Sequence, residues 1–205
     1  MTNKRLILAS KVISSVFSPF YAPLWAFIFL FTFSYLRLLP LGYKIFVLAT
    51  IYCFTVLIPR LGIMIFRKLN KWTHWQLSNR NNRHVPYILS LASYISCLML
   101  MMNMNMPMFV RGILLAAIVS QIVCAILNLW WKVSTHLVGI GGMTGTLIAF
   151  GFLFYFNPLW PLCILLFIAG LLGSSRMILR QHTLAQVTAG FAIGLVSTTT
   201  IILMV

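Results

Sequence analysis

Two arginines and one histidine stand close together between the last two apolar segments of the chain. Arg176 and Arg180 precede His182, and Gln186 follows His182 by four residues. The spacing from Arg176 to His182 is not that of helical neighbours, so we predict a turn between them, followed by a helix on which His182 and Gln186 share a face. A neutral imidazole beside guanidinium groups can attack or bind an anion such as phosphate. In the alternative, the arginines extend to lipid headgroups and the histidine caps a helix.

Two earlier polar segments carry residues of the same chemical types. In one of them, His136 follows Lys132 by four residues, with Ser134 between them. In the other, Arg80 and Arg83 are three residues apart. On a helix these two arginines would be neighbours able to clamp a phosphate, and a solvated basic loop is the alternative.

The composition places these segments in a membrane protein. The chain has 205 residues, of which 61% are hydrophobic, and its mean hydropathy is +1.01. Apolar runs of roughly the 17–25 residues that bilayer crossing requires recur along it. We therefore predict one integral membrane domain, 1–205, an all-α polytopic transmembrane bundle of six to seven spans in a bacterial inner membrane. The runs cover residues 16–36, 45–66, 87–102, 113–131, 137–156, 159–174 and 183–205.

The charge balance indicates which classes of molecule the protein can bind. Fifteen Lys and Arg stand against no Asp or Glu, a formal net charge of +15. Such an excess favours anionic lipid headgroups and phosphorylated substrates. We expect no nucleic-acid partner, because the basic residues lie in short loops between spans. We also expect no metal and no cofactor, because carboxylate ligands are absent and the cysteines lack metal-site spacing. The cysteines fall inside apolar runs, where we expect small buried residues: Cys53, Cys97, Cys124 and Cys163.

Counting spans places the three polar segments on one membrane face. Arg80 and Arg83 follow the second span, His136 follows the fourth, and Arg176 and His182 follow the sixth, so an even number of crossings separates them. The loops on the opposite face contain none of the four histidines. We predict one composite site, in which a neutral imidazole attacks phosphorus and a protonated one donates to the leaving oxygen. Arginines would neutralise the non-bridging oxygens.

Glycines predict where helices approach closely. Gly190 and Gly194 form a GxxxG pattern in the last span, and the fifth run begins with further glycines. Ser134 or Thr135 can cap the N-terminus of that fifth helix.

The polar residues resemble the motifs of the type 2 phosphatidic acid phosphatase (PAP2) superfamily. The similarity covers about residues 80–194, in the family's order and spacing. It consists of Arg80 to Pro86 for the first motif, Ser134-Thr135-His136 for the second, and Ser175-Arg176, five residues and then His182 for the third.

This resemblance implies a lipid phosphatase that works without a cofactor. The expected reaction is hydrolysis of an anionic phospholipid or isoprenoid pyrophosphate through a phosphohistidine. The resemblance makes His182 the nucleophile and His136 the general acid, and Gln186 stands where the family has an Asp that orients the nucleophile. The implied phosphate-binding residues are Arg176, Arg80, Arg83, Lys132 and Ser134.

The sequence departs from the family at several motif positions. Thr135 and Val133 replace a Gly and a Pro of the second motif, the Arg-Pro pair of the first is missing, and Gln186 is neutral. An amide can orient an imidazole but cannot stabilise an imidazolium as an anion does. A catalytically weakened relative that binds or moves an anionic lipid is therefore the alternative, and a structural membrane protein is a third.

Charge also predicts sidedness. Lys and Arg are in excess on the histidine face even when the predicted site residues are left out, so the positive-inside rule makes this face cytoplasmic. The family resemblance implies the outer side instead.

Overall fold

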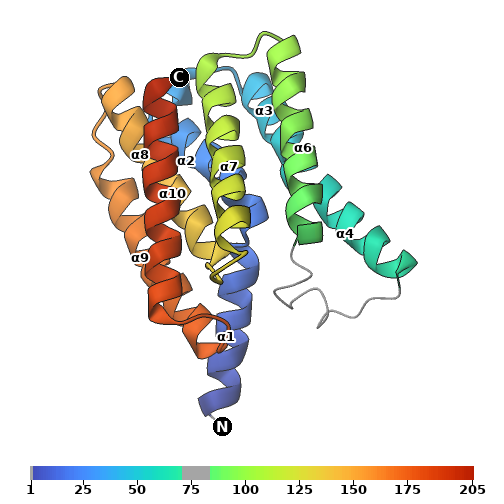
Figure 1. Cartoon of the computed structure of the whole chain (residues 1–205). Coiled ribbons are helices and arrows are strands. Elements are labelled where there is room, and N and C mark those ends of the chain that lie inside the picture. The colour runs from blue at the N-terminus through green and yellow to red at the C-terminus, as the bar shows by residue number, and fades with distance from the viewer. Residues whose placement is uncertain (1, 71–83) are drawn as a thin grey trace.

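The computed structural model describes residues 2–70 and 84–205, which form an all-α bundle without strands in these ranges (Figure 1). Within these described ranges, seven segments are long and apolar enough to cross a membrane. The predicted fold class is therefore confirmed, and the chain is a multi-pass membrane protein. The α-helices are α1 (Thr2–Val16), α2 (Ala22–Phe33), α3 (Leu41–Tyr52), α4 (Ile58–Leu69), α6 (His84–Asn103), α7 (Met108–Leu127), α8 (Thr135–Leu153), α9 (Leu159–Ile178) and α10 (Leu184–Met204).

The first two spans are interrupted, which the sequence analysis did not predict. A 3₁₀ turn, Pro19–Tyr21, separates α1 from α2, so the basic N-terminal stretch belongs to a helix and does not merely precede one. A π-helical turn, Cys53–Leu57, separates α3 from α4, and Pro59 follows it. Proline lacks the backbone N–H that a continuing helix needs, so these breaks occur where the chain loses a donor.

Glycines bring α8 and α10 into backbone contact. A Cβ atom on Gly194 would lie 2.1 Å from the carbonyl oxygen of Val138, and one on Gly141 would lie 2.2 Å from that of Phe191. No side chain fits at such distances, so the predicted GxxxG packing is confirmed. This close approach holds the start of α8 beside the start of α10.

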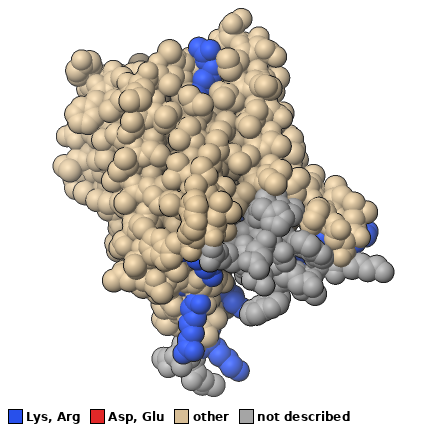
Figure 2. Space-filling view, viewed as in Figure 1, with Lys and Arg blue, Asp and Glu red and all other residues tan. Residues whose placement is uncertain are grey.

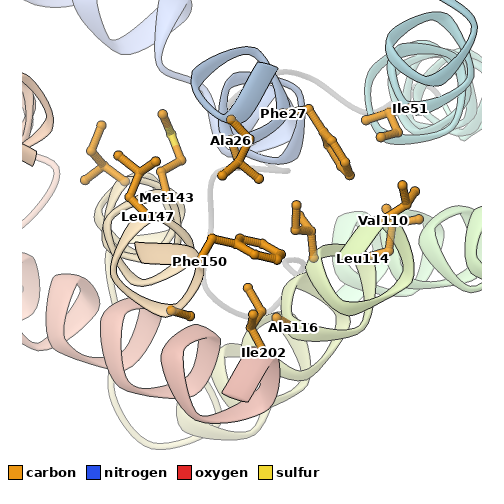
Figure 3. Packing of buried hydrophobic residues seen from close by; sticks show 14 of the residues in the cluster. Ala26, Phe27, Ile51, Val110, Leu114, Ala116, Met143, Leu147, Phe150 and Ile202 are labelled. Carbon is orange, nitrogen blue, oxygen red and sulfur yellow. The ribbon is translucent and has the colours of Figure 1, made fainter. Parts of the chain in front are cut away.

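The apolar core lies where α2, α7 and α8 meet. Phe27, Leu114 and Phe150 are fully buried there (Figure 3). Phe150 also stacks on Phe154, with ring centroids 5.1 Å apart. Packed in this way, the helices form a rigid support for the connections at their ends.

The directions of the helices place the polar connections at one end of the bundle. The α7–α8 and α9–α10 connections lie toward the end that holds the N-terminus, and the C-terminus lies at the other (Figure 1). In the view of Figure 2, Lys and Arg gather at the N-terminal end and at the free end of α4, with one group at the opposite end. The seven spans thus agree with the count that put His136 and His182 on one face.

Candidate active site

A tight turn after α9 presents His182. Gln181 N donates to Arg176 O over 3.1 Å, and Arg180 N donates to Met177 O over 2.9 Å. This Schellman pattern satisfies the last carbonyls of α9. Its left-handed position is usually a glycine, but here it is Arg180, with φ of 51°. The predicted turn is confirmed, although Arg176 itself lies inside α9, which runs beyond the predicted end at 174.

The first turn of α10 fixes the orientation of the His182 ring. Thr183 caps the helix: its Oγ1 accepts from Gln186 N, and Gln186 Oε1 accepts from Thr183 N. Gln186 Oε1 also lies 3.2 Å from His182 Nδ1. Because the Gln186 atom that accepts from Thr183 must be the carbonyl oxygen, Nδ1 must be the donor. The second ring nitrogen, Nε2, then carries the lone pair, as a nucleophile requires.

Arg176 stands at the end of α9 with its guanidinium largely enclosed. Its side chain is 8% exposed, as is that of His182. Arg176 Nη2 donates to the side-chain oxygen of Gln181, which holds the guanidinium in the turn that carries His182. Arg176, His182 and Gln186 therefore belong to one cluster around the α9–α10 connection.

A backbone hydrogen bond ties this cluster to the second polar segment. Ser134 N donates to Gln186 O over 3.3 Å. A Cβ on Gly190 would lie 2.7 Å from Ser134 O, so only glycine lets α10 come this close. The side chain of Ser134 is fully buried, and its Oγ has no hydrogen-bond partner within the described ranges. Ser134 is the N-cap residue of α8, as predicted, but its side chain makes no capping hydrogen bond.

His136 lines a cavity of about 460 Å³. It is the second residue of α8 and is half-buried. The cavity wall includes Thr135, His136 and Arg67 but neither His182 nor Arg176. The two predicted catalytic histidines are thus carried by adjoining helices, and only one of them faces the cavity.

The remaining predicted phosphate-binding residues are distributed differently. Lys132 is half-buried in the connection between α7 and α8 and does not line the cavity. Arg80 and Arg83 lie outside the described residues.

One expectation about the cysteines is wrong. Cys97 and Cys124 are buried and Cys53 is half-buried, but Cys163 is exposed on α9. In a membrane-spanning helix an exposed thiol can face lipid, so an apolar sequence context does not require burial in protein. In the ranges that the structure describes, no group of three His, Cys, Asp or Glu gathers as a metal site would need.

The sequence analysis missed Arg67 as a site residue. It is in the last turn of α4, lines the cavity with His136, and its Nε is buried without a hydrogen-bond partner among the described residues. No local pattern in the sequence marks Arg67, because its place on the cavity follows from the way α4 packs.

The fold and site define a polytopic helical membrane protein with a polar site at one end. Comparison with protein-family models, curated proteins and solved structures finds no match to this chain.

Proposed function

We propose that this chain is a PAP2-like membrane phosphatase that hydrolyses a lipid phosphate or isoprenoid pyrophosphate through a phosphohistidine on His182. The observation that carries the proposal is the hydrogen bond between His182 Nδ1 and Gln186 Oε1. It leaves the lone pair on Nε2 and orients the ring in the α9–α10 connection, to which Arg176 is also hydrogen-bonded through Gln181, an arrangement that suits nucleophilic attack on a phosphate.

In the first step, the Nε2 lone pair of His182 forms a bond to phosphorus while the bond from phosphorus to the leaving oxygen breaks. The protonated His136 gives its proton to that oxygen, so the lipid leaves as an alcohol, or as a monophosphate when the substrate is a pyrophosphate. In the second step, His136 takes a proton from water as the water oxygen attacks phosphorus, and the bond from phosphorus to nitrogen breaks. Phosphate leaves, and both histidines return to their starting states.

The positions of the two histidines support this division of roles. His182 belongs to the Arg176 cluster, where a phosphoryl group finds positive charge, whereas His136 faces an apolar cavity, where the departing lipid can be held. The bond from Ser134 to Gln186 fixes the two segments to each other. A phosphate bridging them would have its leaving group on the cavity side.

A non-catalytic lipid-binding protein is the second candidate, and the neutral Gln186 favours it. A carboxylate in that place would stabilise the positive charge that the ring acquires when Nε2 bonds to phosphorus, and an amide does this less well. Within the main proposal the membrane is a bacterial inner membrane, and the histidine face is cytoplasmic, as its excess of Lys and Arg indicates.

The cheapest test is phosphate release from a panel of single-chain and two-chain lipid phosphates and isoprenoid pyrophosphates, using the purified chain in zwitterionic nanodiscs. We expect release from at least one of them, abolished by His182→Ala. No release from any of them, by a protein that is folded by thermal unfolding, would favour the lipid-binding alternative.

A further inference from the structure

The cavity beside His136 reaches deep into the bundle. It is bounded by α2, α4, α6, α7 and α8. Along α8 its wall extends from His136 to Thr146, ten residues, or about 15 Å at 1.5 Å per residue. Because α8 begins at the polar end of the bundle (Figure 1), the cavity runs from that end toward the middle of the membrane.

The wall of the cavity is mainly apolar, and several of its hydroxyl groups are already occupied. Thr146 donates to Gly142 O over 2.9 Å, and Ser120 donates to Ala116 O over 2.8 Å, each within its own helix. These groups satisfy their hydrogen bonds without a ligand. The inner part of the cavity therefore suits an apolar chain.

Arg67 lies at the polar end of this cavity. Arg60, Ile63 and Arg67 follow one side of α4 at helical spacing. Arg60 is engaged, because its Nη1 donates to the Tyr21 hydroxyl over 2.8 Å and its guanidinium lies over the Tyr21 ring. Arg67 and Ile63 line the cavity instead, and the buried Nε of Arg67 has no hydrogen-bond partner among the residues that the structure describes.

The charge of Arg67 cannot be balanced by another side chain of this protein. The chain contains no Asp or Glu. The Arg67 side chain is half-buried, so an anion would stabilise its guanidinium beside this apolar cavity, and that anion has to come from outside the chain. An anionic ligand headgroup meets this requirement.

The volume is that of a site for one small ligand. A volume of about 460 Å³ lies within the roughly 300–1,000 Å³ of sites that hold one small ligand, which suits one alkyl chain with its headgroup. We propose that this cavity binds a single-chain anionic amphiphile, with its oxygen-bearing headgroup on Arg67 beside His136 and its alkyl chain between α2, α6 and α7. The headgroup is a carboxylate or a phosphate, whose oxygens both match a guanidinium.

This site does not depend on the proposed phosphatase activity, because binding uses Arg67 and needs no phosphoryl transfer. His182 lies outside the cavity wall, so His182→Ala should leave binding unchanged while removing any turnover. The two proposals can therefore fail separately.

The test is photocrosslinking of the full chain in phosphatidylcholine nanodiscs with hexadecanoate that carries a diazirine on its alkyl chain. We expect crosslinked peptides from the inner cavity wall, around Tyr94, Ile113 and Met143. Arg67→Gln should lower the yield at least about tenfold, since it removes the positive charge that pairs with the headgroup. Arg67→Lys, which keeps the charge, should retain most of it. Lys68→Gln is the matched control, because this neighbour is exposed and does not line the cavity.

Competitors identify the headgroup. Hexadecanoate and hexadecyl phosphate should both prevent crosslinking, and the one that acts at the lower concentration identifies the preferred anion. Hexadecanol and hexadecyltrimethylammonium should not compete. Ala117→Phe, which fills the cavity from α7, should abolish the inner crosslinks even if Arg67→Gln does not fold. Equal yields from Arg67→Gln and Lys68→Gln, equal competition by hexadecanol, or crosslinks confined to lipid-facing residues would each overturn the proposal.

Discussion

His182 Nδ1 lies 3.2 Å from Gln186 Oε1, and the same oxygen accepts the backbone N–H of Thr183. One amide oxygen thus caps α10 and sets the tautomer of the ring. Gln186 is neutral, yet it orients the His182 ring, a role that a carboxylate has in the PAP2 superfamily whose motifs this sequence resembles. The electrostatic part, stabilisation of a charged imidazole, is missing.

The first prediction restores that charge with Gln186→Glu, which keeps the length of the side chain and the capping box. An anion beside Nδ1 favours the protonated ring, so the neutral, nucleophilic form requires higher pH. We expect the rising limb of the pH–rate profile for phosphate release to move upward by about one unit. Gln186→Met, which keeps similar bulk without the oxygen, is the control and should lose activity without this displacement. If Gln186→Glu does not change the pH dependence of phosphate release, this would argue against contact between residue 186 and His182.

The second prediction concerns the left-handed backbone of Arg180. Its φ of 51° is unfavourable for a residue with a Cβ, and Arg180→Gly removes that cost. Arg180→Ala loses the same guanidinium but keeps the unfavourable conformation. We expect the glycine variant to exceed the alanine variant in free energy of unfolding by about 1 kcal/mol, measured by reversible denaturation in detergent. Equal stabilities would mean that the turn after α9 does not have this conformation in solution.

The third prediction tests the contact between α8 and α10. Gly194→Ala places a Cβ against the backbone of Val138, and overpacking of this kind costs about 1–3 kcal/mol. Gly170→Ala is the matched control, because no atom lies within 4 Å of its Cβ position. We expect a clear fall in thermal midpoint for Gly194→Ala only. A similar response of both variants would contradict close backbone packing.

The fourth prediction concerns sidedness. In a background without the native cysteines, Trp131→Cys reports on the histidine face and Tyr155→Cys on the opposite face, and both positions are exposed. The positive-inside rule predicts that an impermeant maleimide labels only Tyr155→Cys in intact cells and both variants after lysis. Labelling of Trp131→Cys alone in intact cells would show that the histidine face lies outside the cytoplasm.

Some of this site was accessible from sequence because the physical signals were local. The apolar runs predicted the spans, and the spacing of Arg176 and His182 predicted the turn. The GxxxG pattern predicted close packing, because only a residue without a Cβ permits it.

Other features depend on tertiary arrangement and could not be read from spacing. Arg67 looked like an ordinary basic residue at a span end, and its place on the cavity follows from the way α4 packs. The missing capping hydrogen bond of Ser134 is a second feature of this kind, since the approach of α10 buries its hydroxyl group. That His136 lines the cavity and His182 does not likewise follows from helix packing, because span counting predicts a shared face but not a shared pocket.

The central claim is that His182 carries the phosphoryl group, and trapping that intermediate tests it most directly. The purified chain is mixed with a lipid phosphate that it hydrolyses, quenched in alkali, where phosphohistidine survives, and digested for mass spectrometry. We predict a phosphoryl group on His182 in the parent protein, its absence in His182→Ala, and no loss of folding in that variant by thermal unfolding. Phosphate release by His182→Ala at the parent rate, or a phosphoryl group on another residue, would contradict the account.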